Sequence, residues 1–520
     1  MANKGLFAST IGRLLPKTDT VNHEGSKAYA FTPEHALAQY AATGCLNHAF
    51  YATAQTQLAT VLELASKVEP DFLAKTAVYA REKGHMKDMP ALLVAVLSVR
   101  APKLFAQVFD RVIDDGKMLR NFVQIMRSGA VGRKSLGTRP KKQVLAWLDR
   151  KTDDQVFRAS IGQSPSLADV VKMVHPKPAT DSRRALYAWL LGKPYDAGQL
   201  PELVTRFEQY KADKGGELPD VPFQMLTALE LGTAEWAQIA RQASWQSLRM
   251  NLNTLARHGV FEVDGMAELV AARLRDPKAI AKARVFPYQL MVAYQQTAQQ
   301  AGGVPNVVRD ALQDAMEHAI KNVPAIDGHV WVCPDVSGSM RSPVTGHRKG
   351  ATSAVRCVDV AALFTAAILR QNPRAQVLPF EQAVVPIELN ARDSVMTNAM
   401  KLASIGGGGT NVSAPLRLLV ERKARVDAVV IVSDNESWVD AREGGRGTAT
   451  IAEWNKLLAR NPRAKLVCID VQPYAHTQAL DREDILNVGG FSDQVFDVVA
   501  AFTQGRDAQA WVDTIRAVTL

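Results

Sequence analysis

The chain has 520 residues, too many for one hydrophobic core, so we expect two or more domains. Hydrophobic residues make up 47% of it, as in an ordinary globular protein. The sequence contains no run of about 18 apolar residues and no apolar signal-peptide core, so we expect a cytoplasmic protein without a membrane span. The 4 cysteines stand far apart with no C-x-x-C pair, which favours reduced, mostly buried thiols.

Apolar residues recur at three- and four-residue spacing through residues 1–325, which predicts helices. Thr32-Pro33-Glu34 and Glu69-Pro70-Asp71 mark helix starts, because each supplies a cap or a first-turn proline with acidic residues. Short connections predict stacked antiparallel pairs, so we assign residues 1–325 to an α-helical solenoid with degenerate repeats. The clearest periodic stretches are 36–42, 57–65, 72–81, 91–99, 104–113, 144–148 and 186–191.

The excess of 62 Lys and Arg over 52 Asp and Glu is unevenly placed, because no acidic residue occurs from Gly116 to Leu148. A run of one sign within a helical domain is typical of a surface that binds a polyanion. The alternative is a solvated surface that is basic without having a partner. The cationic residues of this stretch are Lys117, Arg120, Arg127, Arg133, Lys134, Arg139, Lys141 and Lys142.

A second basic group surrounds His175, which ends a predicted helix and precedes Pro176. Imidazole can stack on a nucleobase or bond to a phosphate, and RNA-binding proteins use both modes. Lys172 and Lys177 flank it and are expected to contact phosphates. The alternative is that His175 only caps the helix C-terminus, a favourable place for an imidazolium.

After residue 326, apolar strands alternate with helices. This alternation predicts a parallel sheet covered by helices on both faces, a doubly wound α/β domain over residues 326–520. We expect strands at 330–333, 375–380, 428–432 and 465–471, helices at 354–370, 394–403, 412–419 and 448–458, and closing elements at 489–501 and 508–519.

The loop after the first of these strands reads Pro334-Asp335-Val336-Ser337-Gly338-Ser339-Met340. A carboxylate and two hydroxyls at alternate positions can point at one hard cation, Mg²⁺, Mn²⁺ or Ca²⁺ rather than Zn²⁺. A glycine run at 406–409 can bring Thr410 to the same point, and Asp434 follows another strand. In the alternative, the hydroxyls cap helices and the Asp residues form Asx-turns. The predicted ligands are Asp335, Ser337, Ser339, Thr410 and Asp434.

This pattern resembles the metal-ion-dependent adhesion site of von Willebrand factor A domains. A basic, all-helical part followed by such a domain resembles the Ro autoantigen family, whose helical part is the TROVE module shared with telomerase and vault proteins. The likeness covers essentially the whole chain, and the order of its segments is more specific than any single one. The segments that carry it are 44–65, 133–137, 169–178, 248–252 and 284–288.

The resemblance implies a HEAT-like solenoid that closes into a ring through the A domain. Its outer face would bind Y RNA, and its central hole would accept single-stranded ends of misfolded RNA. It also implies an exoribonuclease partner, especially polynucleotide phosphorylase, and we expect a monomer. Arg158 and His175 match family positions that contact Y RNA. The family's second basic residue, four places after Arg158, is Gly162 here, so binding would depend more on residues 133–142.

The favoured interpretation is a noncoding-RNA chaperone or scaffold in RNA quality control, whose A domain docks a partner through a divalent cation. The alternative is a metal-dependent protein-interaction module that does not bind RNA. A metal-dependent nuclease is a third possibility, but only Glu436 is a candidate general base, so we expect no enzymatic activity. Phe50, Tyr51 and Trp147 lie at helical spacing among Ala and Leu, which predicts core positions rather than base-stacking platforms.

Overall fold

The computed structural model describes residues 15–520 except 45, 215–216, 227–228, 284, 286, 300–302, 321–322, 324, 345, 347–354, 491 and 505–510. The chain forms two compact units. The first combines the residues up to Val68 with Ile320–Ala517. The second comprises Glu69–Ala319 and Val518–Leu520. Within the described ranges, every helix is too short or too polar to span a lipid bilayer.

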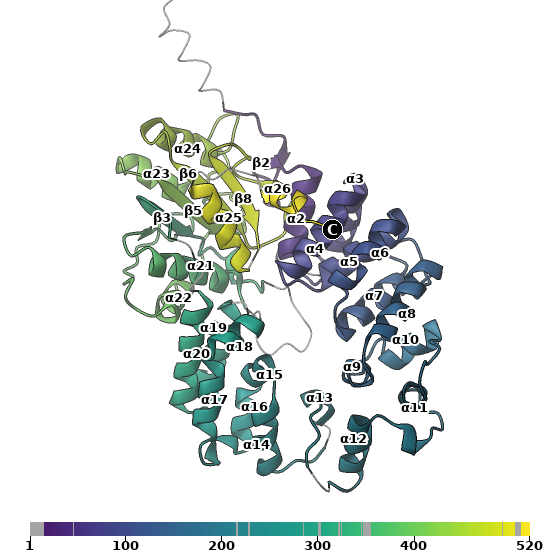
Figure 1. The fold of residues 1–520 in the computed structure, drawn as a ribbon. Helices are drawn as coiled ribbons and strands as arrows, with labels where there is room; N and C mark the ends of the chain where they lie inside the picture. Colours follow the sequence, from purple (N-terminus) through teal and green to yellow (C-terminus); the bar gives the residue numbers. More distant parts are fainter. Residues whose placement is uncertain are drawn as a thin grey trace, which may run out of the picture. The chain divides into compact units, whose positions relative to one another are not determined.

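A five-stranded sheet lies at the centre of the first unit (Figure 1), with the strand order β4-β3-β5-β6-β8. Every neighbouring pair in it is parallel. Nearly all residues of its four longer strands are buried, as expected of a parallel sheet covered on both faces. The strands are β3 (Val330–Pro334), β4 (Gln376–Val377), β5 (Ala428–Ser433), β6 (Lys465–Asp470) and β8 (Ile485–Gly489).

Helices cover both faces of this sheet. On one face, Trp454 of α24 (Ala449–Arg460) and the leucines of α23 (Ala414–Glu421) pack in one buried cluster with Trp331 and Ile431. The strand residues that alternate with these face α21 (Cys357–Gln371) and α25 (Asp493–Thr503). The rings of Phe364 and Phe496 join these two helices, with centroids 4.7 Å apart. Helix α22 (Val395–Ala403) packs against α21, and α26 (Trp511–Arg516) contacts β8.

The N-terminal residues of the first unit do not form a helical repeat but pack against this α/β domain. Strand β2 (Lys27–Ala30) pairs antiparallel with β1 (Thr20–Val21) and with β7 (His476–Thr477). Helix α2 (Pro33–Thr43) follows, with Thr32 accepting a hydrogen bond from the His35 N–H as its cap. Helix α3 (Ala54–Lys67) packs on α2.

Two polar contacts fix α2 on the sheet. Gln39 Nε2 donates to the buried Asp470 Oδ2 at 2.9 Å, and His35 Nδ1 lies 2.7 Å from Asp481 Oδ2. Gly489 leaves room for the first contact, because a Cβ there would lie 2.0 Å from Gln39 Oε1. These contacts explain why residues up to Val68 group with the C-terminal part, whereas the sequence analysis assigned residues 1–325 to one helical domain.

The second unit is built from helices that pack mainly against their near neighbours in sequence, as stacked helical pairs do (Figure 1). Helix α5 contacts α4, α6 and α7, and α20 contacts α17, α18 and α19. The helices are α4 (Pro70–Glu82), α5 (Asp88–Arg100), α6 (Pro102–Val112), α7 (Gly116–Ser128), α8 (Thr138–Arg150), α9 (Asp153–Ala159), α10 (Leu167–Val174), α11 (Asp181–Leu190), α12 (Glu202–Asp213), α13 (Phe223–Leu226), α14 (Thr233–Gln242), α15 (Trp245–Met250), α16 (Leu252–Arg257), α17 (Met266–Leu274), α18 (Pro277–Ala283), α19 (Pro287–Gln299) and α20 (Asn306–Ala319).

Most predicted elements are present, with shifted bounds. The strand expected at 375–380 is only β4. Strand β8 was not predicted, and the closing element expected at 489–501 corresponds mainly to α25. The start of the helix expected at 354–370 lies outside the described residues, and α21 is described from Cys357. Cys333, Cys357 and Cys468 are free and buried as expected, whereas Cys45 lies outside the described residues.

Replacing Asp481 by asparagine tests the contact between α2 and the sheet. Burial alone would raise the pKa of the Asp481 carboxyl, but hydrogen bonds from His35 and Asn487 hold it below its usual range. A carboxyl with a lowered pKa stabilises the folded state above its unfolded pKa, and this contribution is lost as the pH falls. The carboxylate is 41% exposed, so solvent screens the pair. We expect Asp481→Asn to cost about 1 kcal/mol near neutral pH, a few degrees in Tm.

Thermal melting from about pH 7 to pH 3 measures this effect, and the gap between wild type and Asp481→Asn should shrink as the pH falls. Glu63→Gln is the matched control, because it removes an exposed carboxylate that pairs with Lys67 at 2.5 Å. A gap that stayed constant down to the lowest pH would contradict the role given to Asp481.

Candidate metal centre and nucleic-acid interface

The five predicted metal ligands lie on three loops at the carboxyl edge of the parallel sheet. Asp335 follows β3, Thr410 precedes α23, and Asp434 follows β5. The Ser337 and Ser339 hydroxyl oxygens are 3.3 Å apart, and the Ser339 hydroxyl hydrogen-bonds to Asp434. The backbone carbonyl of Thr410 accepts hydrogen bonds from the N–H groups of Trp438 and Val439, both at 3.1 Å. All five side chains are buried: Asp335, Ser337, Ser339, Thr410 and Asp434.

Short contacts hold these loops against one another. The Ser433 hydroxyl donates to Asp335 Oδ2 at 2.5 Å, and the Gly338 N–H donates to the Gly408 carbonyl at 2.9 Å. Gly406 has a φ of +78°, and a Cβ there would lie 2.3 Å from the Val336 carbonyl oxygen. Glycine is therefore required at this position, because it allows the loop that carries Thr410 to approach the Asp335 loop.

Burial dominates the electrostatics of the two carboxyl groups. It raises the pKa of Asp335 to about 6. Burial also raises the pKa of Asp434, and the negative charge of Asp335 raises it further. Two buried negative charges are costly unless a cation neutralises them. The hydroxyls of Ser337, Ser339 and Thr410 add three hard oxygen donors to the two carboxylates. The residues present therefore fit a hard divalent cation.

Of the two alternative roles considered for these residues, the structure shows Asx-turns but no helix caps. Asp335 and Asp434 each accept an N–H two residues on, from Ser337 at 2.8 Å and Glu436 at 3.4 Å, so both form Asx-turns. The hydroxyls of Ser337, Ser339 and Thr410 do not cap helices, since the residues at the N-caps of the neighbouring helices are Gly338 and Ser413. Each Asx-turn uses only one lone pair of its carboxylate, so further lone pairs remain for another partner.

Glu436, the candidate general base, is engaged in structural contacts. It is fully buried, with Oε1 2.7 Å from His476 Nε2 and Oε2 accepting the His23 N–H at 2.9 Å. Asn22 Nδ2 also donates to the Ser437 carbonyl, at 2.6 Å. The turn between β1 and β2 is thus bound to the loop that follows Asp434.

An exposed aromatic side chain, which no sequence pattern predicts, lies beside the metal loops. Trp438 is 44% exposed and Val439 is 39% exposed, although both belong to the loop that carries Asp434. A Cβ on Gly409 would lie 2.6 Å from the Trp438 ring, so this indole rests directly on the glycine loop. A large exposed indole is the kind of side chain that anchors protein–protein interfaces.

The twelve residues predicted to bind RNA all lie in the second unit, on α7 to α10, the loops that join them and the segment that follows α10. Within the described residues, only Arg158 among them forms an ion pair, to Asp220 at 3.1 Å. Arg120, Lys141 and Arg158 are partly buried. The other nine are exposed: Lys117, Arg127, Arg133, Lys134, Arg139, Lys142, Lys172, His175 and Lys177.

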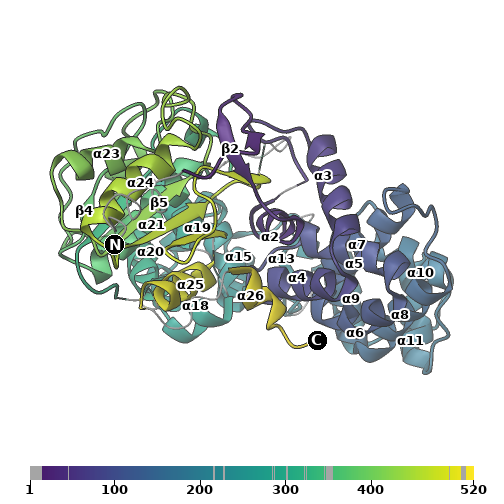
Figure 2. The same cartoon turned by 90° about the horizontal axis from the view of Figure 1, so that it is seen from above.

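The helices that carry these residues are neighbours. Helix α10 contacts α7 and α8, as both cartoon views show (Figures 1 and 2). Asp169 on α10 interacts electrostatically with Lys172 and with Arg127 of α7, which places those two cations near one carboxylate. The acid-free stretch and the His175 segment therefore form parts of one basic region, rather than being scattered over unrelated helices.

Arg120 occupies the space that Gly162 leaves open. Its guanidinium donates to the Ala159 carbonyl at 2.7 Å, and a Cβ on Gly162 would lie 2.6 Å from Arg120 Nη2. Gly162 has a φ of +102°, which glycine adopts without strain. A guanidinium thus lies beside the position where the resemblance leads us to expect a basic residue.

The sequence left two roles open for His175, a helix C-cap and an RNA contact, and the structure fits both. Its backbone is left-handed with a φ of 51° and ends α10, and its N–H donates to Val171 at 3.0 Å. Its side chain is exposed. The predicted core position of Trp147 is confirmed, because it is buried and its indole donates to the Ile113 carbonyl at 2.8 Å. That prediction is wrong for Phe50, which is 54% exposed. Tyr51 is half-buried and stacks on His23.

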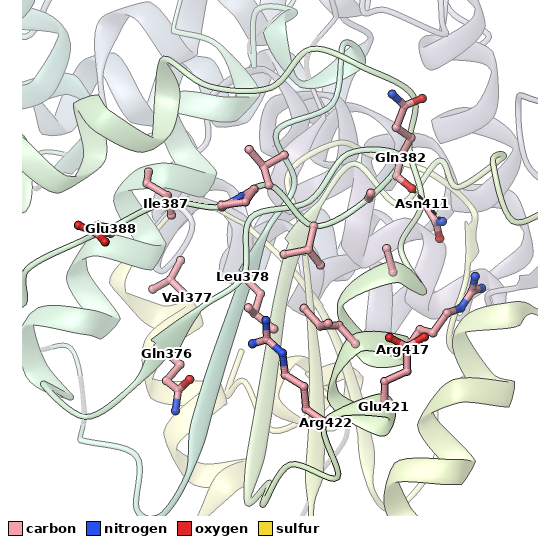
Figure 3. Close-up of a pocket in the computed structure, with 16 residues that line it drawn as sticks. Gln376, Val377, Leu378, Gln382, Ile387, Glu388, Asn411, Arg417, Glu421 and Arg422 are labelled. Carbon is pink, nitrogen blue, oxygen red and sulfur yellow. Dashed lines mark hydrogen bonds between the residues drawn. The ribbon is translucent and has the colours of Figure 1, made fainter.

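A hollow of about 790 Å³ lies at the β4 edge of the sheet (Figure 3). Val377, Leu378 and Ile387 line one part of it, and Arg417 and Arg422 reach it from α23 and the residue after it. None of the residues predicted to bind metal or RNA lines this hollow. Periodicity does not reveal such a cavity, because its walls come from three separate segments.

Comparison with known proteins identifies the class of the α/β domain. Residues 329–503 match the family model described as the Ro60 vWA domain. This range contains all five predicted metal ligands and the whole five-stranded sheet.

The similarity extends over nearly the full chain. The "RNA-binding protein RO60" of Deinococcus radiodurans is 27% identical over 517 residues, which span 93% of this chain and 95% of that protein. The "RNA-binding protein RO60" of Caenorhabditis elegans is 22% identical over 246 residues, 46% of this chain and 36% of that one. Both relatives are named for RNA binding, and neither name states a reaction. The resemblance to the Ro autoantigen family is therefore confirmed.

A solved structure supports the fold. The crystal structure of the Deinococcus radiodurans Ro protein superposes with a TM-score of 0.61, at 21% identity, over 91% of this chain and 100% of that one. The predicted fold class, a helical solenoid with a doubly wound A domain, is confirmed. Closure of the solenoid into a ring stays a prediction.

Proposed function

We propose that this chain binds RNA through its helical unit and docks a protein partner through a divalent cation on its A domain. The observation that carries the first part is the basic region of α7 to α10, with nine exposed side chains that form no ion pair among the described residues. Exposed cations on neighbouring helices are what a polyanion binds. The names of both relatives support RNA as that polyanion.

Most of these side chains would contact phosphates, which position an RNA without reading its sequence. Arg158 and Asp220 are 37% and 68% exposed, so their ion pair is weak and a phosphate can displace the carboxylate. Arg120 would add a guanidinium beside Gly162. The exposed ring of His175 would stack on a base or donate to a phosphate.

The finer proposal is that the bound RNAs are Y-like noncoding RNAs and single-stranded ends of misfolded RNA. The protein would then act as a scaffold or chaperone in RNA quality control. The resemblance to the Ro family supports this choice of ligands, and the basic region supplies the electrostatic affinity they need.

The salt dependence of binding tests the electrostatic mechanism. If about six to eight phosphates are neutralised, log K should fall with log salt at a slope of about −4 to −6 for a single strand. Filter binding of a labelled oligoribonucleotide over a range of salt concentrations measures this slope. A flat salt dependence would remove the RNA-binding proposal and favour a protein-interaction module.

Charge reversal tests the location of the RNA site. Replacing Arg133, Lys134, Arg139 and Lys142 by glutamate should weaken RNA binding at least tenfold. The melting temperature should stay nearly constant, because exposed charges contribute little to stability. The matched control reverses the same number of exposed cations elsewhere: Lys103, Lys193, Arg257 and Arg463. Equal losses in both variants would mean that net charge alone governs binding.

For the A domain, we propose a site for one divalent cation, which is Mg²⁺, Mn²⁺ or Ca²⁺. Its ligands are Asp335, Ser337, Ser339, Thr410 and Asp434. The bound ion would present a positive charge to a carboxylate of the partner protein. Trp438 would pack against the same partner, because it is exposed beside the glycine loop. An exoribonuclease such as polynucleotide phosphorylase is the partner that the family resemblance suggests.

Thermal melting with chelator and with millimolar Mg²⁺ tests the cation site. At about 100 times its Kd, a ligand of the folded state adds about 2.7 kcal/mol, a rise of several degrees in Tm. Asp335→Ala and Thr410→Ala should each abolish this rise. Ser404→Ala, an exposed hydroxyl outside the ligand set, should retain it. Equal melting of the wild type in the two conditions would contradict cation binding.

A further inference from the structure

Two hollows of the helical unit meet at the start of α15. One, of about 640 Å³, is lined by residues of α13, α14 and α15, with Arg158 at its wall. The other, of about 430 Å³, lies between α15 and α18. Ser244 and Gln246 line both hollows. A single ligand that crosses this loop can therefore enter both.

The wall of the larger hollow is rich in groups that read hydrogen-bonding edges. It carries the amides of Gln224, Gln242, Gln246 and Asn251 and the hydroxyls of Ser244 and Ser247. Among the described residues of this wall, Met250 is a large exposed apolar side chain, with 68% of it exposed. Methionine packs well against aromatic rings through its polarisable sulfur. Amides beside an apolar contact are suited to a planar, polar-edged ring.

Gln246 lines both hollows, and its amide oxygen is unsatisfied. Its Oε1 is buried and accepts no hydrogen bond within the described part of the chain. A buried acceptor without a donor is unfavourable, so proteins rarely leave one unless another molecule satisfies it.

A cation is present at each hollow. Arg158 lines the larger one, and its ion pair with Asp220 is exposed and displaceable. Lys282 lines the smaller one and is exposed, with no ion pair in the described ranges. Arg273 and Asp276 also line it, but the Arg273 guanidinium donates to the Ala240 and Arg241 carbonyls at 2.7 and 2.6 Å. The cationic groups thus lie on both sides of the amide-lined wall.

We propose that the larger hollow holds one unpaired base of a single-stranded RNA, a site that depends on the RNA binding proposed above. The amide of Gln246 hydrogen-bonds to the base edge, and Met250 packs on the base face. Arg158 and Lys282 contact the phosphates on either side. A single strand alternates bases with phosphates, which matches an amide-lined hollow flanked by cations.

The experiment compares two labelled 12-mer oligoribonucleotides of identical charge, one complete and one abasic at its central positions. Fluorescence anisotropy at constant salt gives the ratio of their affinities. The wild type should bind the complete strand about three- to tenfold more tightly, as expected for one hydrogen bond and one ring contact. Gln246→Ala and Met250→Ala should each move this ratio toward one and leave the affinity for the abasic strand unchanged.

Controls separate the base site from general RNA binding. Gln199→Ala, an exposed glutamine outside both hollows, should keep the wild-type ratio. Arg158→Ala should weaken both strands equally, because both retain the phosphates. Because Met250 is exposed, its variant is expected to fold, whatever Gln246→Ala does.

The outcomes distinguish the two proposals. A wild type that binds neither strand would overturn the proposed RNA binding itself. A wild type that binds both strands equally, or variants that keep the wild-type ratio, would overturn the base site alone and leave the hollow to a protein ligand.

Discussion

The register between β3 and β5 decides where the A domain can bind a cation. The two strands pair in parallel with Pro334 opposite Val432, so both leave the sheet at the same edge. The Asp335 N–H still donates to the Val432 carbonyl at 2.9 Å, which holds the first carboxylate at this edge. Asp434 comes two residues after Val432, so the backbone alone brings two acids into one buried region. A slip of one residue would turn every side chain of the strand to the other face.

The two units handle charge in opposite ways. The A domain buries carboxyl groups among hydroxyls, so their stability depends on neighbours, hydrogen bonds or a cation. The helical unit exposes cationic groups that have few acidic neighbours, which contributes to the net charge of +10. Buried charges give a specific local site, whereas exposed ones give a long-range field that salt weakens. A chain with both is suited to gathering a polyanion and a protein on one scaffold.

The sequence was sufficient where the signal is local or repeated. Helical periodicity, helix starts and alternating strands predicted the fold class, and D-x-S-x-S with a glycine run predicted the buried loop cluster. It was insufficient where partners are distant. The pairing of β2 with β7 joins residues far apart in the chain, and neither strand shows a strong pattern. Helical spacing among Ala and Leu predicts a core position for Phe50, yet its surroundings leave it 54% exposed. The unpaired oxygen of Gln246 is visible only from three-dimensional contacts.

The pair formed by Arg120 and Gly162 changes how sequences of this kind should be compared. The two residues lie in different segments, yet the absence of a side chain at one makes room for the long side chain of the other. An alignment column at position 162 records a lost cation, although the folded surface has a guanidinium at nearly the same place. A long residue introduced there would have to displace Arg120. The two positions are thus expected to vary together, and the charge of such surfaces is better counted in space than column by column.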